Sequence, residues 1–326
     1  MKKIRMAFLA LTAFALLATS TGCGGGGGDS DNDDTPAAES SSTGGSGSGS
    51  TTTSIPAGFV AVPGATFDGT TAITGSSVFI AGRTVTIPNL LVCDHEVTQA
   101  EYQSVMGANP SDFSGTNKPV EKVSWYDALV YCNKRSIAEQ RMPCYTINDS
   151  TNPNAWGSVP TWSTSSNKAA WDAATCNFNA NGYRLPTEAE WEYLARGGNL
   201  TNNGQTIYSG TGDIGNLAWY RVNANDVGSS SPNYGTHQVK TKDPNGKTIY
   251  DMSGNVCEWC WDWYGSINQS TGPTGAASGS LRVNRGGGWY YPAAYCTVSY
   301  RIFDYYTNPY SRHYGGGFRV VCSRSE

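Results

Sequence analysis

The chain has 326 residues, 38% of them hydrophobic, and its 22 Lys and Arg against 26 Asp and Glu give a formal net charge of −4. These charges are dispersed and form no basic stripe, which argues against nucleic acid as a partner. Beyond residue 54 no apolar stretch is long enough for a transmembrane helix, and the remaining length suits one large, irregular domain.

Residues 1–23 are typical of a bacterial export signal. A basic start precedes an apolar stretch, from Met6 to Ala18, that is too short to span a bilayer. The residues from Ser20 to Cys23 resemble a lipobox, with Ser20 in place of the more usual leucine. We predict lipidation at Cys23 and anchoring to the bacterial outer membrane or cell surface, with the lipid as the only membrane contact. An ordinary secretory peptide cut nearby is the alternative.

Residues 24–54 are low-complexity Gly, Ser, Thr and Asp, and they predict a flexible tether because so few apolar side chains cannot offset the entropy of ordering. A folded domain is expected over residues 55–326.

Nine cysteines less Cys23 leave eight, which could form disulfides in 105 pairings in an exported protein. Cys257 and Cys260 have the C-x-x-C spacing of zinc sites, but no second pair follows, so zinc is not expected.

Three helices are predicted from their first turns. Residues 98–101 and 187–190 both read Thr-x-x-Glu, the capping-box pattern in which hydroxyl and carboxylate satisfy free backbone donors. Ser124 opens a third, longer helix that runs through Ile137.

Short strands are predicted at residues 59–62, 78–80 and 84–87, where β-branched and aromatic residues are interrupted by Gly and Pro. The rest is rich in Gly, Asn, Ser and Pro, which predicts long loops, and loops of that length in a compact domain are usually functional. The fold class is therefore α+β, with few helices, short strands and much irregular structure.

A tyrosine-rich segment lies between two glycine runs, residues 286–288 and 315–317. Its eight tyrosines fit neither the period of a strand nor that of a helix. Tyrosine supplies rigid, amphipathic contact area at low entropic cost, so most of these side chains are expected to line a contact surface rather than a core.

Six motifs, in order along the chain, resemble those of the formylglycine-generating-enzyme/sulfatase-modifying family. They cover nearly everything from Phe59 to Val321 and include Glu-Val-Thr-Gln, Leu-Pro-Thr-Glu-Ala-Glu-Trp-Glu and Gly-Asn-Val-Cys-Glu-Trp. The motifs occupy residues 93–102, 119–128, 183–193, 250–259, 285–289 and 317–320. The resemblance implies an elaborated C-type-lectin-like fold.

Enzymes of this family oxidise a substrate cysteine with two copper-binding cysteines. Alignment on the Arg-Gly-Gly frame puts Cys296 at the second cysteine position and Tyr291 at the first. A phenol cannot replace a thiolate as a ligand of copper(I), so we expect no oxidase activity and no required cofactor. An exported oxidase that uses Cys296 with another cysteine is the alternative. A second enzymatic branch needs clustered histidines, but the three histidines here lie on separate segments.

A third branch of the resemblance fits better, that of the variable proteins of diversity-generating retroelements. In these, adenine-directed mutagenesis turns AAC or AAT codons into many residues, but never into Lys, Glu, Gln, Met or Trp. Residues 288–316 contain no Lys, Glu, Gln or Met, although this depletion extends upstream to Ser270. Trp289 belongs to the glycine frame. We predict that residues 288–316 are the variable region of a monomeric, non-catalytic surface protein that binds a protein or glycan ligand.

A site that tolerates substitution must be exposed on a backbone fixed by other residues. The expected fixing residues are Trp289, Pro292, Cys296, Arg301, Phe318 and Arg319. The expected exposed ligand-binding residues are Tyr290, Tyr291, Ser299, Tyr300, Ile302, Phe303, Asp304, Tyr305, Tyr306, Asn308, Tyr310, His313 and Tyr314.

The resemblance also implies structural calcium. Asn255 and Glu258 match one site of the family, and Asn216 with the carbonyl of Leu217 matches a second; oxygen ligands of this kind suit a hard cation. A loop-capping role for Asn255 is the alternative. The sugar-binding motifs of calcium-dependent lectins are absent from the sequence, so glycan binding through calcium is not expected.

Overall fold

A computed structural model describes residues 55–324, so the predicted signal, the lipidation at Cys23 and the tether lie outside the described residues. Short strands and few helices are joined by long loops. The strands are β1 (Phe59–Val62), β2 (Ala65–Phe67), β3 (Val85–Ile87), β4 (Leu90–Cys93), β5 (Tyr145–Thr146), β6 (Thr175–Cys176), β7 (Cys257–Trp263), β8 (Arg282–Arg285), β9 (Gly316–Gly317) and β10 (Val321–Ser323). The helices are α1 (Gln99–Met106), α2 (Trp125–Ala138), α3 (Lys168–Asp172), α4 (Glu188–Ala195) and α5 (Ile214–Leu217).

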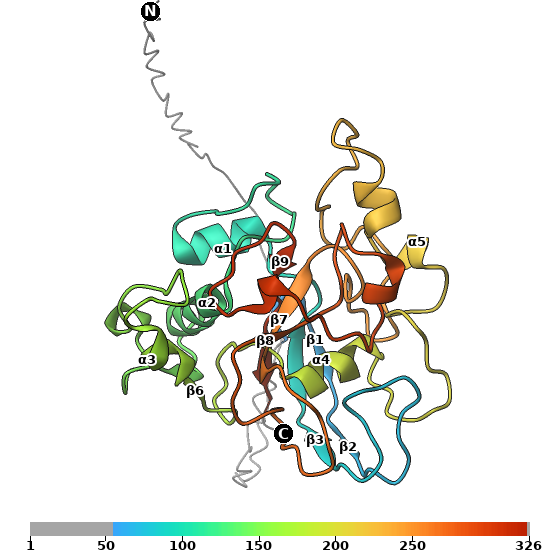
Figure 1. Cartoon of the computed structure of the whole chain (residues 1–326), viewed down its shortest axis with the longest axis horizontal. Coiled ribbons are helices and arrows are strands. Elements are labelled where there is room, and N and C mark those ends of the chain that lie inside the picture. Colours follow the sequence, from blue (N-terminus) through green and yellow to red (C-terminus); the bar gives the residue numbers. More distant parts are fainter. Residues whose placement is uncertain (1–54, 325–326) are drawn as a thin grey trace, which may run out of the picture. The chain divides into compact units, whose positions relative to one another are not determined.

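Two three-stranded sheets organise the fold (Figure 1). In the first, β4 lies between β1 and β10, and both pairings are antiparallel. In the second, β7 lies between β8, which is antiparallel to it, and β9, which is parallel. Because β8 precedes the tyrosine-rich segment and β9 follows it, this segment is held at both ends by the same central strand.

The three predicted helix starts are confirmed. Thr98, Ser124 and Thr187 each accept a hydrogen bond from the backbone N–H three residues later, and the carboxylate there accepts one from the capping residue. Each box therefore satisfies two of the backbone donors that a helix start leaves free. Helix α1 ends at Gly107, whose φ of 81° is the left-handed conformation that glycine tolerates.

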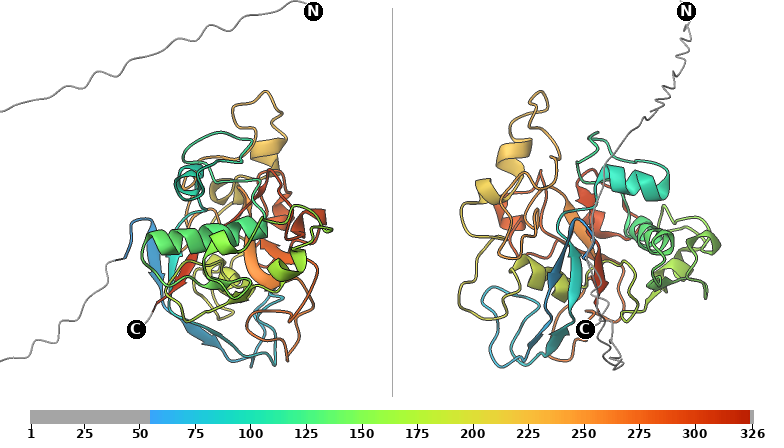
Figure 2. Two further views of the ribbon diagram at one scale, coloured as in Figure 1. Left: turned by 90° about the vertical axis from the view of Figure 1, so that its left-hand side faces the viewer. Right: turned by 180° about the vertical axis from the view of Figure 1, so that it is seen from behind.

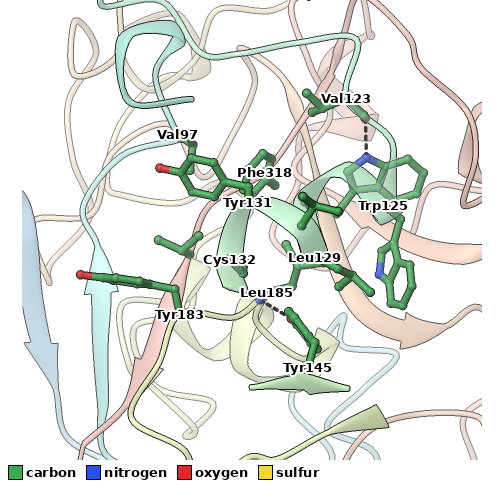
Figure 3. Close-up of a cluster of buried hydrophobic side chains, with 14 of the residues drawn as sticks. Val97, Val123, Trp125, Leu129, Tyr131, Cys132, Tyr145, Tyr183, Leu185 and Phe318 are labelled. Atoms are coloured by element: carbon green, nitrogen blue, oxygen red, sulfur yellow. Dashed lines mark hydrogen bonds between the residues drawn. The ribbon is translucent and has the colours of Figure 1, made fainter. Parts of the chain in front are cut away.

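The core is built around α2, most of whose residues are buried (Figure 3). Leu129 and Tyr131 on this helix pack with Leu185 and Phe318 from distant parts of the chain. The buried Tyr145 hydroxyl accepts a hydrogen bond of 2.7 Å from the backbone N–H of Leu185. Such aromatic residues fill the core while their polar atoms keep partners.

The strand predicted at residues 78–80 is wrong. Val78 and Phe79 are buried, but both backbone N–H groups donate to the Ser76 hydroxyl, and the carbonyl of Phe79 accepts from Ile73. Backbone groups held in a local turn cannot join a ladder. The other two predicted strands correspond to β1 and β3.

Long loops carry much of the chain, as predicted. Between α4 and β7 the only α-helix among the described residues is the short α5, and the gold part of this stretch projects at the top of both views of Figure 2. The described part of the chain has no helix of the length and apolarity that crossing a membrane requires.

Candidate ligand-binding surface

The glycine run before the tyrosine-rich segment, residues 286–288, is packed too tightly for side chains. Gly286 and Gly287 have φ values of 88° and 74°, and a Cβ on Gly287 would lie 2.5 Å from the Cys296 sulfur. The next large residue, Trp289, is buried, and its indole N–H donates to the carbonyl of Tyr314 at 3.2 Å. The start of the segment is thereby joined to its end.

Buried ion pairs fix the backbone around the segment. Arg285 donates to Glu192 at 2.5 Å, and Arg301 makes two bonds of 2.6 and 2.8 Å to Glu188. Both carboxylates belong to α4, so one helix holds the segment's beginning and middle. Beyond its end, Arg319 makes a two-bond pair with Glu258 on β7, at 2.6 and 2.7 Å. Such pairs have geometric specificity as well as energy.

The aromatic side chains of the segment gather into one group. The His313 ring lies 3.8 Å from Tyr306, 3.9 Å from Tyr314 and 5.1 Å from Tyr290, measured between ring centroids. Tyr291 continues the group from Tyr290 at 4.2 Å. Separate stretches of the segment therefore meet through aromatic contacts, as expected for a single surface.

The thirteen predicted ligand-binding residues differ in exposure. Exposed are Phe303, Tyr305, Tyr306 and Tyr314, and half-buried are Tyr290, Ser299, Tyr300, Asp304, Asn308 and Tyr310. Buried are Tyr291, Ile302 and His313. We call the exposed and half-buried set the aromatic surface.

The expected exposure is wrong for the three buried residues. Ile302 is 1% exposed because its backbone pairs with Asn284, which turns its side chain toward Tyr291 and the nearby cysteines. The Tyr291 hydroxyl donates to Asp304 beneath the surface. The sequence pattern could not reveal the isolated β-bridge between Ile302 and Asn284, since no periodic spacing of apolar residues marks it.

His313 is buried among tyrosines rather than presented to solvent. Burial lowers its pKa to about 4, despite the opposing charge of Asp304, so the ring is neutral at physiological pH. Its Nδ1 atom accepts a bond of 3.2 Å from the Gly315 backbone. His313 thus supports the surface from below.

Among the residues expected to fix the backbone, Pro292 departs from expectation because it is exposed. Trp289, Cys296, Phe318 and Arg319 are buried, and Arg301 is half-buried in its ion pair with α4.

A cavity of about 300 Å³ opens beside the aromatic surface. One wall comes from Thr161 and Trp162, in the loop before α3, and neither residue was predicted to belong to a site. The other wall consists of Tyr305, Tyr306, Tyr310, Ser311 and Arg312. The sequence offers one sign of this wall: a single Trp lies in a run of Ser and Thr. The run lacks the periodic spacing of apolar residues that a buried helix or strand would show.

Cys296 does not have the environment of a reactive thiol. It is fully buried in a cluster with Cys257, Tyr291 and Ile302. Burial raises the pKa of Cys296 to about 12 and also raises the pKa of Cys257. Since the thiolate is the nucleophile, burial disfavours the reactive form of both cysteines in the metal-free protein. All eight cysteines of the described residues have free thiols.

The residues that match the family's calcium sites are engaged with protein groups. Glu258 accepts bonds from Arg319 and from the Trp191 indole. The Asn255 side chain accepts from the His237 backbone at 3.0 Å and donates to Glu96 at 2.7 Å, which is the loop-capping role. At the second site, Asn216 is exposed, and its carbonyl accepts a bond from the Asp243 backbone, whereas Leu217 is buried. Calcium binding stays a prediction.

A separate polar cluster joins β4 to α1. The His95 ring lies between two carboxylates, 2.5 Å from Asp94 and 3.4 Å from Glu101. The Cys93 sulfur is nearly equidistant from both ring nitrogens, at 3.7 and 3.9 Å, and so lies along neither lone pair. Burial opposes charge on His95, but the hydrogen bond to Asp94 and the nearby Cys93 and Glu101 raise its pKa to about 12. This geometry suits an imidazolium cation between carboxylates better than a metal centre.

Comparison with known proteins places these features in a family. The sulfatase-modifying factor enzyme 1-like domain matches residues 41–324. A protein named chaperone protein LppX, from Paenibacillus barcinonensis, is 39% identical over 228 residues, which are 67% of this chain and 75% of the relative. The formylglycine-generating enzyme of Streptomyces coelicolor is 36% identical over 170 residues, 47% of this chain and 50% of that enzyme's length.

Solved structures agree. Treponema denticola variable protein 1 superposes with a TM-score of 0.65 at 36% identity, over 82% of this chain and 95% of that chain. The structure of CarF superposes with a TM-score of 0.60 at 24% identity, over 83% of this chain and 100% of that chain, which shows a shared fold alone. The predicted α+β, C-type-lectin-like fold and the resemblance to variable proteins are confirmed. The chain belongs to the sulfatase-modifying factor enzyme 1-like domain family.

Proposed function

We propose that this protein is a non-catalytic surface lipoprotein whose aromatic surface binds a protein or glycan ligand, on a frame that stays fixed while the surface residues vary. The observation that carries the proposal is that residues fixing the backbone are buried, whereas residues of the aromatic surface between them are exposed. Trp289, Phe318 and Arg319 are buried in the frame, whereas Tyr305, Tyr306 and Phe303 are exposed between them.

Exposed aromatic residues need an explanation in a folded protein. Phe303 and Tyr305 are 66% and 67% exposed, and they adjoin the half-buried Tyr310 and Asp304 along the segment. Large exposed apolar area usually marks an interaction site, and tyrosine is suited to it because few rotamers are lost on binding. The similarity to Treponema denticola variable protein 1 supports the proposal that a segment of this chain varies.

The geometry is compatible with diversification of the segment. Both its ends are held by β7, and its backbone is held by α4, through residues outside the exposed set. Substitutions at exposed positions therefore change ligand contacts without removing buried area. Lipid anchoring through Cys23 would place such a surface at the cell exterior.

Sequencing of the DNA around the gene tests this proposal. We expect a reverse-transcriptase gene and a near-copy of the codons for residues 288–316, with adenines in the copy wherever the two differ. The differing codons should include those of Tyr305 and Tyr306 and exclude those of Trp289 and Cys296. Absence of such a copy, or differences spread over buried codons, would contradict a diversified site.

The alternative function is an exported oxidase, and one observation bears on it: Cys257 and Cys296 lie in the same buried cluster. Catalysis would require a thiolate within reach of substrate. Treatment of the folded protein with a thiol-alkylating reagent, followed by mass spectrometry of peptides, should leave Cys296 unmodified until denaturant is added. Rapid alkylation of native Cys296 together with Cys257 would instead support the oxidase.

A further inference from the structure

We propose that the cavity between the loop before α3 and the tyrosine-rich segment binds a proline-rich segment of a protein partner in the polyproline II conformation, with Trp162 as a wall that lies outside the variable region. This inference rests on the proposed function and specifies its ligand. In the left-hand view of Figure 2 the loop (green) lies beside the C-terminal segment (red).

The backbone of Trp162 is held in place although the residue is exposed. Its side chain is 65% exposed, yet its backbone N–H donates to the Ser165 hydroxyl and its carbonyl accepts from the Ser165 N–H. The Asn167 side chain closes the same loop with a bond of 2.6 Å to the Ser158 carbonyl. A pre-organised loop holds the backbone that carries the indole, so little further backbone entropy is lost on binding.

The facing wall is held by polar groups beneath it. The Asp304 carboxylate accepts from the Tyr306 backbone at 2.8 Å, and Asn308 donates to the Tyr305 carbonyl at 2.7 Å. These bonds fix the turn that presents Tyr305 and Tyr306 to the cavity. Tyr310 packs partly against the main core. The cavity therefore has aromatic rings on both sides, each on a braced backbone.

The charge in the cavity is neutralised. Arg312 is the only charged residue among those that line it, and its guanidinium makes bonds of 2.7 and 2.8 Å to Asp127. Asp127 is also the carboxylate of the capping box of α2, so this pair is anchored to a helix start. Because Arg312 is already paired with Asp127, neither a cation nor an anion finds an unpaired charge among the lining residues. A neutral ligand is favoured.

The hydrogen-bonding groups of the aromatic rings that line the cavity favour a neutral ligand that is rich in acceptors. An indole N–H can only donate, and the exposed phenol hydroxyls of Tyr305 and Tyr306 can donate as well. A polyproline II segment suits donors of this kind because its carbonyls have no internal partners and its prolines lack N–H groups. Aromatic-lined grooves are the usual recognition sites for such segments, whose rigidity reduces the entropy lost on binding.

Binding of peptides to the full-length protein tests the proposal. The probes are an oligoproline peptide and a set of Pro-x-x-Pro peptides with neutral residues at x. Fluorescence anisotropy measures the binding of each peptide. We expect at least one peptide to bind, and Trp162→Ala and Tyr305→Ala each to weaken binding about tenfold or more, as for aromatic hot-spot residues. Ile207→Ala is the matched control, because Ile207 is 67% exposed but lies outside the cavity.

Three outcomes would overturn the proposal. The first is that no proline-rich peptide binds. The second is that Trp162→Ala leaves peptide affinity unchanged while Tyr305→Ala abolishes it, because the loop before α3 is then no part of the site. The third is that neutral oligosaccharides, tested in parallel, bind through Trp162 and the peptides do not. None of these touches the proposed function, which fails instead if the genomic DNA holds no template copy.

Discussion

The buried pair of Arg319 and Glu258 shows how single residues fix this molecule. Neither side chain is exposed to solvent, and Arg319 also donates to the carbonyls of Cys93 and Tyr250. The guanidinium thus connects β7 to the end of β4 and to the loop before β7. Breaking a buried pair is costly because it leaves one charge in the interior without a partner.

We predict that Glu258→Gln lowers the free energy of unfolding by about 3–5 kcal/mol, measured by urea denaturation, since it leaves the buried Arg319 unpaired. The matched control is Asp112→Asn, which removes a pair with Lys122 whose two side chains are 53% and 38% exposed. That change should cost less than about 1 kcal/mol, as is usual for surface pairs. Equal effects of the two substitutions would contradict the structural role of the buried pair.

His95 supplies a pH-dependent contribution. Its pKa rises from 6.5 to about 12 on folding, so the stabilisation is complete below pH 6.5 and declines as pH rises toward the folded value. Burial opposes the charge on Glu101, but bonds to His95 and Thr98 lower its pKa from 4.5 to about 2, so its contribution is lost as pH falls below 4.5. The combined effect is largest between about pH 5 and 6.5.

We therefore predict that His95→Asn lowers stability most between about pH 5 and 6.5, by about 2 kcal/mol, a typical value for hydrogen bonds to charged groups. The difference from the unsubstituted protein should shrink as pH is raised to 10. Thermal unfolding of both proteins across this range is the measurement. A difference that stays constant from pH 6 to 10 would show that His95 is not charged in the folded state.

At the scale of elements, α4 connects the core to the tyrosine-rich segment. Its capping box includes Glu190, which also makes bonds of 2.6 and 2.8 Å to the buried Arg184. The other two glutamates of the same helix do not lie in solvent either, because Glu192 pairs with Arg285, just before the segment, and Glu188 pairs with Arg301 within it. A short helix with three glutamates among its eight residues is therefore buried throughout.

Removal of the cap should destabilise this connection. We predict that Thr187→Ala lowers the free energy of unfolding by about 1–2 kcal/mol, the usual range for loss of a helix cap, because the Glu190 backbone N–H loses its partner. Thr84→Ala, at an exposed threonine just before β3, should change it by less than about 0.5 kcal/mol. Urea denaturation of both variants measures the difference in the free energy of unfolding. If Thr187→Ala leaves that free energy unchanged, the cap is excluded as a stabilising feature.

For the whole molecule, the proposed separation of frame and surface makes a stability prediction. Tyr305→Ser combined with Tyr306→Ser should change the free energy of unfolding by less than about 1 kcal/mol, since both side chains are exposed. Trp289→Ala should lower it by about 3–5 kcal/mol, because it leaves a cavity in the interior. Chemical denaturation of the purified variants is the measurement. A large loss in the double variant would mean that these tyrosines are part of the folding core.

The sequence by itself determined the helix starts and the family. Capping boxes are local, because the hydroxyl and the carboxylate lie three residues apart, so Thr98, Ser124 and Thr187 could be read directly. It also located the aromatic surface by composition, since tyrosines at irregular spacing match no regular element.

Only the tertiary structure decided which aromatic and apolar residues face solvent and what lies opposite them. A single bridge to Asn284 buries Ile302, whereas its neighbour Phe303 is exposed. Trp162 meets Tyr305 across a cavity although more than a hundred residues separate them in sequence. Exposure in irregular segments depends on contacts between residues that are distant in sequence, and no local period records such contacts.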